Sequence, residues 1–394
     1  MVLDDAYTST GAKFFAHQEA MTNLRNGRGQ PIVTHVMLTD VCQHTCAFCS
    51  VQARAGDTLA FDDVVAYLDI LRNYGLKAVI LSGGGNPILY KCRATGRNFN
   101  DVVDAIHSYG LEIGLITNGM PLRKFHVSGM REGEMGPEFV ETFRDSWGAV
   151  RPSTLDKLTW VRISMAGLDH EEREVYVPDI DHAKTTIGFS YVAHDLYDAP
   201  EDPHHGKVST EADVLHLGGD LDSRKVWRFE DRILALTSQI EEYVRIYHPR
   251  YVRLLPNCLE PALIPERCRQ LQQMADMIDP SVVFVQNKPP AAPKACLLGA
   301  IHPVLNSDGY CYPCDSCVLN EAAGHKFGET WRMCHWSEIS KLYDNPLPRS
   351  LISDTHKQCP GCVFSKSNEI LQGVRDGSIN SVPPTVTPEH VNFV

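Results

Sequence analysis

The chain has 394 residues, with 37 lysines and arginines, 49 aspartates and glutamates, and 13 cysteines. At about 150 residues per domain, this length predicts two domains, or three. The net charge of −12 (37 − 49) disfavours a nucleic-acid polymer as partner. No stretch is apolar over the roughly 18 residues that a membrane span needs, and residues 1–30 lack the apolar core of a signal peptide. We therefore expect a cytoplasmic protein that does not contact a membrane.

The cysteines are the most informative residue type. Thirteen is an odd number, and a reducing compartment disfavours disulfides. Their spacing is uneven, with clusters near Cys42 and Cys314 and a further pair that begins at Cys359. Clustered cysteines in a cytosolic chain indicate metal ligands first.

Short β-rich runs alternate with amphipathic helices from residue 31 to about residue 256. Apolar residues at one-face spacing predict helices over 61–71 and 99–106, and a glycine follows each. Two further helices are expected over about 229–247 and 261–278. The six expected strands are 32–38, 78–81, 113–116, 160–163, 187–192 and 251–255.

Strands that alternate with helices imply an α/β fold with a parallel sheet, because parallel neighbours need crossover connections. Such a sheet stays open or curls into a partial barrel, and in both cases ligands bind at the C-terminal ends of the strands. The expected divisions are an N-terminal extension (1–30), the core (31–256), a linking helix and strand (257–295), and a smaller C-terminal α+β domain with a tail (296–394).

Residues 197–225 interrupt this alternation with a stretch rich in Pro, His, Asp and Gly. A loop of this length is typical of a lid, a binding loop or a disordered segment. His204 and His205 could bind a metal there, although adjacent histidines in a loop are more often only solvated.

The first cysteine cluster directly follows the first strand. Cys42, Cys46 and Cys49 have C-x3-C-x2-C spacing. Three thiolates can hold three corners of a [4Fe–4S] cube, which leaves one iron open for a small molecule. The alternative is a zinc ion held by the three cysteines and His44.

This spacing, with the aromatic Phe48 before the last cysteine, resembles the radical SAM superfamily. The resemblance implies a partial (β/α)6 barrel of the TIM type as the core. In the family, the open iron binds S-adenosylmethionine (SAM), and the aromatic residue packs near the adenine. The resemblance also implies that an electron from a flavodoxin- or ferredoxin-type donor cleaves SAM to methionine and a 5′-deoxyadenosyl radical. That radical then removes a hydrogen atom from an unactivated carbon.

Three more strand ends match the family pattern and imply SAM contacts. A Gly-Gly-Gly-Asn-Pro run stands where the family usually has Gly-Gly-Glu-Pro, so Gly84 and Gly85 let the backbone approach the methionyl group. Asn86 replaces the Glu that accepts a hydrogen bond from the SAM amino group, and its amide oxygen can still accept. Asn118 ends the third strand, and Ser164 ends the fourth.

A second set of cysteines near the C-terminus could hold an auxiliary [4Fe–4S] cluster with no open iron. A hairpin turn is expected at 306–310 between them. The layout resembles the twitch domain, the shorter relative of the SPASM domain. A zinc ribbon is the alternative. The expected ligands are Cys296, Cys314, Cys359 and Cys362. The spare cysteines that could replace one of them are Cys311, Cys317 and Cys334.

The fate of the substrate radical separates two reactions. In a dehydrogenation, the auxiliary cluster is a suitable acceptor for the second electron. In an epimerisation or isomerisation, a hydrogen atom must usually return, and Cys258 just past the sixth strand could donate it. The alternative for Cys258 is a small buried hydrophobe. Candidate substrate contacts by position alone are Tyr191, His194, Asp195 and Arg253.

The substrate class is the remaining question. Many SPASM and twitch enzymes modify ribosomal peptides, often with a leader-binding domain before the core, whereas only residues 1–30 precede the core here. A small molecule such as an amino sugar, amino acid or nucleoside is therefore favoured. The chain could instead be a non-catalytic iron–sulfur or zinc protein. In such a protein the glycine run and Asn118 would have no evident function.

Overall fold

The computed structural model describes most of the chain. The described residues are 6–7, 11–44, 46, 48–49, 54–122, 126–127, 130–131, 134–146, 148–169, 174–198, 208–209, 226–287, 291, 295–316, 331–349, 351, 359 and 361–394. Within these residues, none of the helices has the length and apolarity of a membrane span.

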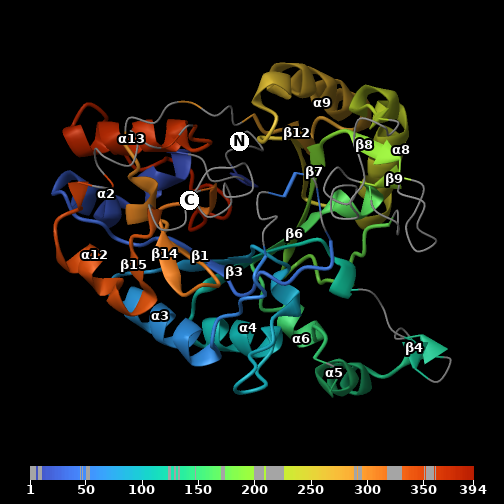
Figure 1. The fold of residues 1–394 in the computed structure, drawn as a ribbon, viewed down its shortest axis with the longest axis horizontal. Helices are drawn as coiled ribbons and strands as arrows, with labels where there is room; N and C mark the ends of the chain where they lie inside the picture. The colour runs from blue at the N-terminus through green and yellow to red at the C-terminus, as the bar shows by residue number, and fades with distance from the viewer. Residues whose placement is uncertain are drawn as a thin grey trace.

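One curved sheet organises the fold (Figure 1). Its strand order is β12-β11-β7-β6-β3-β2-β1-β13-β14-β15, and every neighbouring pair from β12 to β13 is parallel. The six strands expected from the sequence form the middle of this sheet, which confirms the α/β class. They are β1 (Val33–Met37), β2 (Ala78–Ser82), β3 (Glu112–Thr117), β6 (Trp160–Ser164), β7 (Thr186–Ala193) and β11 (Tyr251–Pro256).

Strands from the C-terminal part of the chain extend the same sheet. β12 (Val283–Val285) pairs with β11, and β13 (Val304–Leu305) pairs with β1. The expected hairpin joins β13 to β14 (Tyr310–Tyr312), and β15 (Cys334–His335) adds beside it. The sheet therefore runs across the domain boundary expected at residue 295, and the cysteine-rich segment is built directly onto the core sheet.

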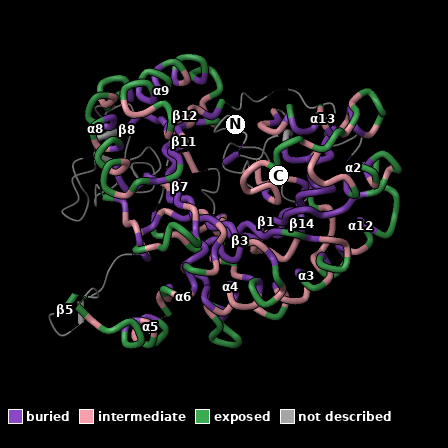
Figure 2. The backbone as a smooth tube through the Cα atoms, turned by 180° about the vertical axis from the view of Figure 1, so that it is seen from behind, coloured by how far each residue is buried: buried purple, intermediate pink, exposed green. Residues whose placement is uncertain are grey.

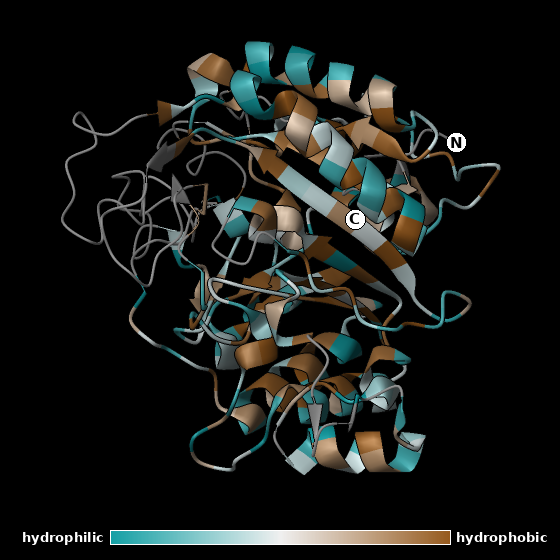
Figure 3. Cartoon of the chain, turned by 90° about the vertical axis from the view of Figure 1, so that its right-hand side faces the viewer, coloured by the Kyte–Doolittle hydropathy of each residue, from teal (hydrophilic) through white to brown (hydrophobic). Residues whose placement is uncertain are grey.

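Helices lie along the outside of the curved sheet (Figure 1). The four expected helices are present, and α3 buries residues 64, 67, 68 and 71, the spacing of one helical face. Figure 2 shows the buried residues following the strands, and Figure 3 shows hydrophobic and hydrophilic residues interspersed along the helices. Within the described residues, the α-helices are α2 (Gln18–Arg25), α3 (Phe61–Asn73), α4 (Phe99–Ser108), α5 (Pro137–Ser146), α6 (Pro152–Leu155), α8 (Phe229–Tyr247), α9 (Ile264–Ile278), α12 (Ser340–Asp344) and α13 (Ser365–Asp376).

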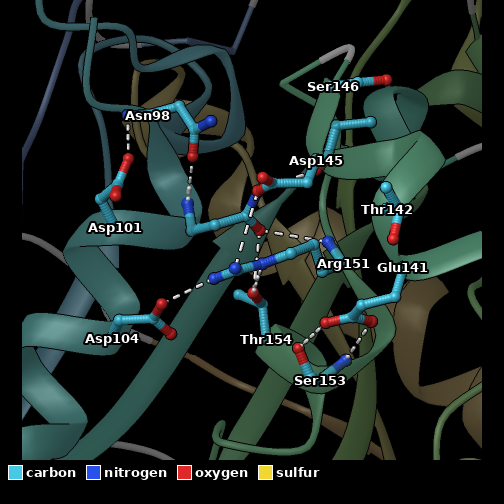
Figure 4. Close-up of polar contacts among 12 residues, drawn as sticks. Asn98, Asp101, Asp104, Glu141, Thr142, Asp145, Ser146, Arg151, Ser153 and Thr154 are labelled. Carbon is cyan, nitrogen blue, oxygen red and sulfur yellow. Dashed lines mark hydrogen bonds and ion pairs between the residues drawn. The ribbon is translucent and has the colours of Figure 1, made fainter. Parts of the chain in front are cut away.

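A polar network anchors α4 beside the segment that leads into β6 (Figure 4). Asn98 and Asp101 form a capping box at the start of α4, which satisfies backbone N–H groups that the helix leaves unpaired. Arg151 donates from Nη2 to Asp104 Oδ2 at 2.6 Å, and its Nη1 lies 3.6 Å from Asp145. Because Arg151 immediately precedes α6, these contacts help to fix where β6 begins.

The segment expected as a loop over 197–225 is in part a small sheet. β8 (Leu196–Asp198) pairs with β9 (Val208–Ser209) and with β10 (Val226–Trp227), all antiparallel. Short strands in a polar stretch lack the long alternation that reveals a strand in a sequence. His204 and His205 lie outside the described residues.

Two strand glycines make room for aromatic rings inside the curved sheet. A Cβ added to Gly114 would lie 2.1 Å from the ring of Trp160, and one added to Gly188 would lie 2.1 Å from the ring of Tyr251. No real Cβ approaches so closely, so each ring can lie flat over its neighbouring strand only because that strand has a glycine.

The two terminal segments pack under these rings. Tyr7 stacks on Tyr251 with 4.4 Å between ring centroids, and Phe393 packs edge-on to Trp160 at 5.2 Å. Such aromatic pairs add stabilisation beyond the buried area. Residues near both ends of the chain thus close the side of the sheet opposite to the C-terminal strand ends.

We expect Gly114→Ala to lower the free energy of unfolding by about 1–3 kcal/mol, because the new methyl group overpacks the Trp160 ring. Chemical denaturation measures the loss. In a Trp160→Leu background, Gly114→Ala should lower the free energy of unfolding by clearly less, because the clashing ring is gone. Equal costs in the two backgrounds would contradict this account.

Candidate functional site

The three-cysteine loop leaves the sheet at the end of β1 and is closed at its base. Thr39 and Thr58 share a hydroxyl hydrogen bond of 2.8 Å, and the Asp40 backbone N–H donates to Asp57 O at 3.0 Å. The Asp40 carboxylate accepts from the Ala55 N–H at 2.8 Å. These bonds join Thr39 and Asp40 to residues 55–58 and so close the base of the cysteine loop at the C-terminal edge of the sheet, where the sequence placed it.

The three thiols of this loop are all half-buried. The Cys49 N–H donates to Cys46 O at 2.9 Å, so these two residues form one turn. Burial raises the pKa of the Cys42 thiol. Arg54 Nη2 donates to Cys49 Sγ at 3.5 Å, and a nearby cation favours the thiolate form that binds metals. The sequence analysis missed Arg54, since no spacing rule marks a cation five residues after a cysteine.

The glycine run after β2 is bonded to the start of the cysteine loop. The Gly85 N–H donates to Thr39 O at 3.0 Å, and the Asn86 N–H donates to Val41 O at 2.8 Å. A Cβ added to Gly85 would lie 2.1 Å from Val41 O. Gly85 is therefore required by the contact between the two loops themselves. Gly84 is buried beside it.

Hydrogen bonds fix the orientation of the Asn86 side chain, which is 3% exposed. Its Oδ1 accepts from the Ile88 N–H at 3.3 Å and from the Thr117 hydroxyl at 3.0 Å. Its Nδ2 donates to Asn118 Oδ1 at 2.7 Å, and that oxygen also accepts from the Met120 N–H at 3.2 Å. Because backbone N–H groups can only donate, the oxygens of both amides are identified.

Asn118 joins the end of β3 to the cysteine loop. Its Oδ1 also accepts from Gln43 Nε2 at 2.8 Å, and its Nδ2 lies 3.9 Å from Cys42 Sγ. Ser164 is the last residue of β6, level with Asn118 because Thr117 pairs in register with Ile163. Hydrogen bonds thus join the predicted residues that follow β1, β2 and β3, and the sheet register places Ser164 level with them at the end of β6.

Phe48 extends this site to the end of β7. Its ring packs against His194 with 4.9 Å between centroids. His194 Nδ1 lies 2.9 Å from Val192 O, and since a carbonyl only accepts, Nδ1 carries the proton. Its Nε2 lies 3.7 Å from the Asp169 carboxylate, which also pairs with Arg232. The Phe48 ring therefore contacts a histidine whose own orientation is fixed by Val192.

Two other candidate substrate contacts are held by the protein itself. The Tyr191 hydroxyl accepts from Arg232 at 3.2 Å. The Asp195 carboxylate accepts from the Phe229 N–H at the start of α8 and from Arg267, at 2.8 and 2.6 Å. These contacts attach α8 and α9 to the end of β7, a structural role that position at a strand end did not reveal.

The last two sequence candidates lie on or just after β11. Arg253 lines a cavity inside the curved sheet. Cys258 is exposed in the turn that follows β11. Its role as a hydrogen-atom donor stays a prediction.

The four expected auxiliary ligands come together in the C-terminal region. Burial raises the pKa of Cys296 well above that of an ordinary thiol, and the charges of the other three cysteines raise it further. Burial also raises the pKa of Cys362 to about 12. Asn368 of α13 holds the group in place, because its Nδ2 donates to Cys362 Sγ at 3.6 Å and its Oδ1 accepts from the Leu297 N–H at 2.7 Å.

Two of the spare cysteines contact each other instead. Cys311 and Cys334 are paired in register across β14 and β15, and their side chains share a hydrogen bond. Burial raises the pKa of Cys311, which packs near Tyr67. Cys317 lies outside the described residues.

Both groups of cysteines have the donor chemistry that iron–sulfur clusters use. Each thiolate of a [4Fe–4S] cube binds a different iron, so the thiolates need not converge on one point. Within the described residues, no three His, Cys, Asp or Glu side chains meet closely enough to hold a single metal ion.

We expect Asn86→Asp to lower the free energy of unfolding by about 1–3 kcal/mol. The new carboxylate would place an acceptor against Asn118 Oδ1, where the amide now donates at 2.7 Å. The loss should shrink on acidification, because a protonated carboxyl can donate. Urea denaturation at two pH values measures both effects. Asn380→Asp at an exposed position is the control, and equal losses in the two variants would refute this account.

Comparison with known proteins adds a family match. Residues 36–176 match the sequence model of the Radical SAM superfamily. No curated protein matches the chain. Among solved structures, SuiB of Streptococcus suis bound to the precursor peptide SuiA is similar with 11% identity and a TM-score of 0.49, over 96% of this chain and 80% of that one. Native anSMEcpe with bound AdoMet and Cp18Cys peptide is similar with 12% identity and a TM-score of 0.45, over 88% of this chain and 98% of that one.

The matched residues include the cysteine loop, the glycine run, Asn118 and Ser164, which are the strand-end features that the fold brings together. The family implies a [4Fe–4S] cluster and SAM as cofactors. Residues 36–176 of the chain are identified as a radical SAM domain.

Proposed function

We propose that this chain cleaves SAM reductively and abstracts a hydrogen atom from an unactivated carbon of a small-molecule substrate. The observation that carries the proposal is the junction of three strand-end loops. Gly85 and Asn86 are bonded through their backbones to the cysteine loop, and Asn118 reaches Cys42 from the third strand. This junction supports one binding place that is shared by a cluster and SAM.

When bound, the [4Fe–4S] cluster supplies the electron that cleaves SAM to methionine and a 5′-deoxyadenosyl radical. Cys42, Cys46 and Cys49 would hold three of its irons. Arg54, which donates to Cys49 Sγ at 3.5 Å, offsets part of the thiolate charge. A flavodoxin- or ferredoxin-type protein would supply the electron.

The chain's own residues would orient SAM at the strand ends. Gly84 and Gly85 leave no side chain over the methionyl group. The Asn86 oxygen, which the sequence suggests for the SAM amino group, already accepts two hydrogen bonds. We therefore assign Asn86 chiefly to holding Asn118 in place. Phe48, supported by His194, would pack near the adenine.

A second cluster would bind to Cys296, Cys314, Cys359 and Cys362, in a domain of the twitch type. The proximity of these four thiols and the separate Cys311–Cys334 contact support this ligand set. Such a cluster has no open iron, so its use would be electron transfer. It favours a dehydrogenation, in which a second electron must leave the substrate radical.

Epimerisation or isomerisation is the other outcome, and it needs a hydrogen donor. Cys258 is exposed after β11, so its S–H hydrogen can exchange with water. In that reaction the substrate radical takes the hydrogen atom of Cys258, and the thiyl radical that remains must be reduced by an electron and a proton.

We expect anaerobic reconstitution to give about eight irons per chain, which is two [4Fe–4S] clusters, and 5′-deoxyadenosine when SAM and a reductant are added. The Cys42→Ala, Cys46→Ala, Cys49→Ala triple variant should retain about four irons and form no 5′-deoxyadenosine. Cys268→Ala, a cysteine of α9, is the control and should behave as the parent. Bound zinc without SAM cleavage would contradict the proposal.

Turnover in deuterated water separates the two reactions. Dehydrogenation should give a product two hydrogens lighter without solvent deuterium, and Cys258→Ala should still turn over. Epimerisation through Cys258 should place deuterium in the product, and Cys258→Ala should abolish turnover. Mass spectrometry of the product measures both its loss of hydrogen and its deuterium content. Solvent deuterium in the product of Cys258→Ala would exclude this cysteine as the donor.

A further inference from the structure

The curved sheet encloses a cavity of about 170 Å³ directly beneath the strand-end site. Ser82, Ile116 and Arg162 line it. Arg162 lies two residues before Ser164 on β6, and Ser82 and Ile116 lie two residues before Gly84 and Asn118, which follow β2 and β3. Side chains two residues apart on a strand point to the same face, so Arg162 lies one layer below Ser164. Cys314, an expected auxiliary ligand, lines it from the C-terminal region. The cavity thus reaches the C-terminal cysteine group.

Arg162 is the unusual residue of this cavity. The residue is 8% exposed, and its Nε is buried without a hydrogen-bond partner in the described part of the chain. The Trp160 ring lies 5.4 Å from its Cζ. By contrast, the buried Arg267 pairs with Asp195 at 2.6 Å. A buried cation that pairs with no anion is costly. Asp315 lines the same cavity with a buried Oδ1 that has no hydrogen-bond partner in the described residues, but it forms no ion pair with Arg162, so the position favours a further anion.

The rest of the lining adds to this positive charge. Lys13 and Arg253 also line the cavity, whereas Asp315 is the single carboxylate among its lining residues. His35, 6% exposed, has an Nε2 without a partner in the described residues, and burial lowers its pKa, so the ring is neutral and able to hydrogen-bond. The cavity lining therefore contains more cationic than anionic side chains.

The walls around these cations are largely aromatic. Trp160, Tyr251, Phe364 and Phe393 all line the cavity. The volume is close to the roughly 150 Å³ that holds a benzene-sized molecule. It is too small for a whole nucleotide, but it accommodates an anionic group with a few carbons.

We infer that this cavity binds the oxyanion end of the substrate, a carboxylate or a phosphate, through Arg162, with Arg253 and His35 beside it. The inference rests on the proposed function, because a substrate held there would extend upward to the strand ends where SAM binds. Arg162 then selects the substrate by charge and sets which carbon reaches the radical.

Calorimetry on the reconstituted full chain tests the site with benzoate, inorganic phosphate and the neutral benzamide. At least one anion should bind more tightly than benzamide, and the preferred anion distinguishes a carboxylate from a phosphate end. Arg162→Gln should weaken the binding of that anion about tenfold to a hundredfold. Arg245→Gln, at an exposed position of α8, is the control and should bind as the parent. Absence of anion binding, or equal binding by Arg162→Gln, would overturn the inference.

Thermal unfolding gives a second measurement that does not depend on the choice of probe. Without ligand, Arg162→Gln should unfold at the same temperature as the parent or higher, because it removes an uncompensated buried charge. A clearly lower unfolding temperature would mean that the guanidinium has a structural partner, and it would overturn the inference.

The two proposals fail separately. If the chain cleaves SAM but binds neither anion, the anion site is wrong and the proposed function stands. If it binds an anion through Arg162 but does not cleave SAM, the site stands and the proposed function is wrong.

Discussion

The close approach of two backbones, at Gly85 and Val41, is the contact on which the rest of the site depends. Any side chain at Gly85 would meet Val41 O, and the same few residues carry the hydrogen bonds that join the glycine run to the cysteine loop. With the two loops joined, Asn86 and Asn118 can form one amide network that ends at Cys42. A single glycine thus links the geometry of the cluster loop to that of the predicted SAM contacts.

Much of the fold was predictable because the parallel core has strong local signals. Buried strands are continuous apolar runs, helices repeat at one-face spacing, and parallel strand ends meet at one edge. The pairing of β13 with β1 was not predictable, because residues 304 and 35 are far apart in sequence and two-residue strands have no period. The packing of Tyr7 and Phe393 under the rings of the sheet is likewise a long-range contact without a sequence pattern.

The site was predictable in its members but not in its hydrogen bonds. Motif position identified Asn86 and Asn118, yet the direction of the Asn86 amide is set by the Ile88 N–H, which no motif reports. Position also suggested Asp195 as a substrate contact, whereas Arg267, on a distant helix, occupies its carboxylate. Strand-end position shows where ligands can bind, but it does not show which side chains the protein already uses.

The arginines of the core show how that distinction can be made. Arg162 had a sequence signal of its own, a charged residue within the apolar run of a buried strand. Only the structure shows that it differs from Arg267, whose charge Asp195 neutralises. An uncompensated buried charge lowers the stability of the folded protein, so a neutral side chain of similar size at this position would give a more stable protein. A chain that keeps such a residue beneath its reactive site gives up stability for binding, as functional sites commonly do.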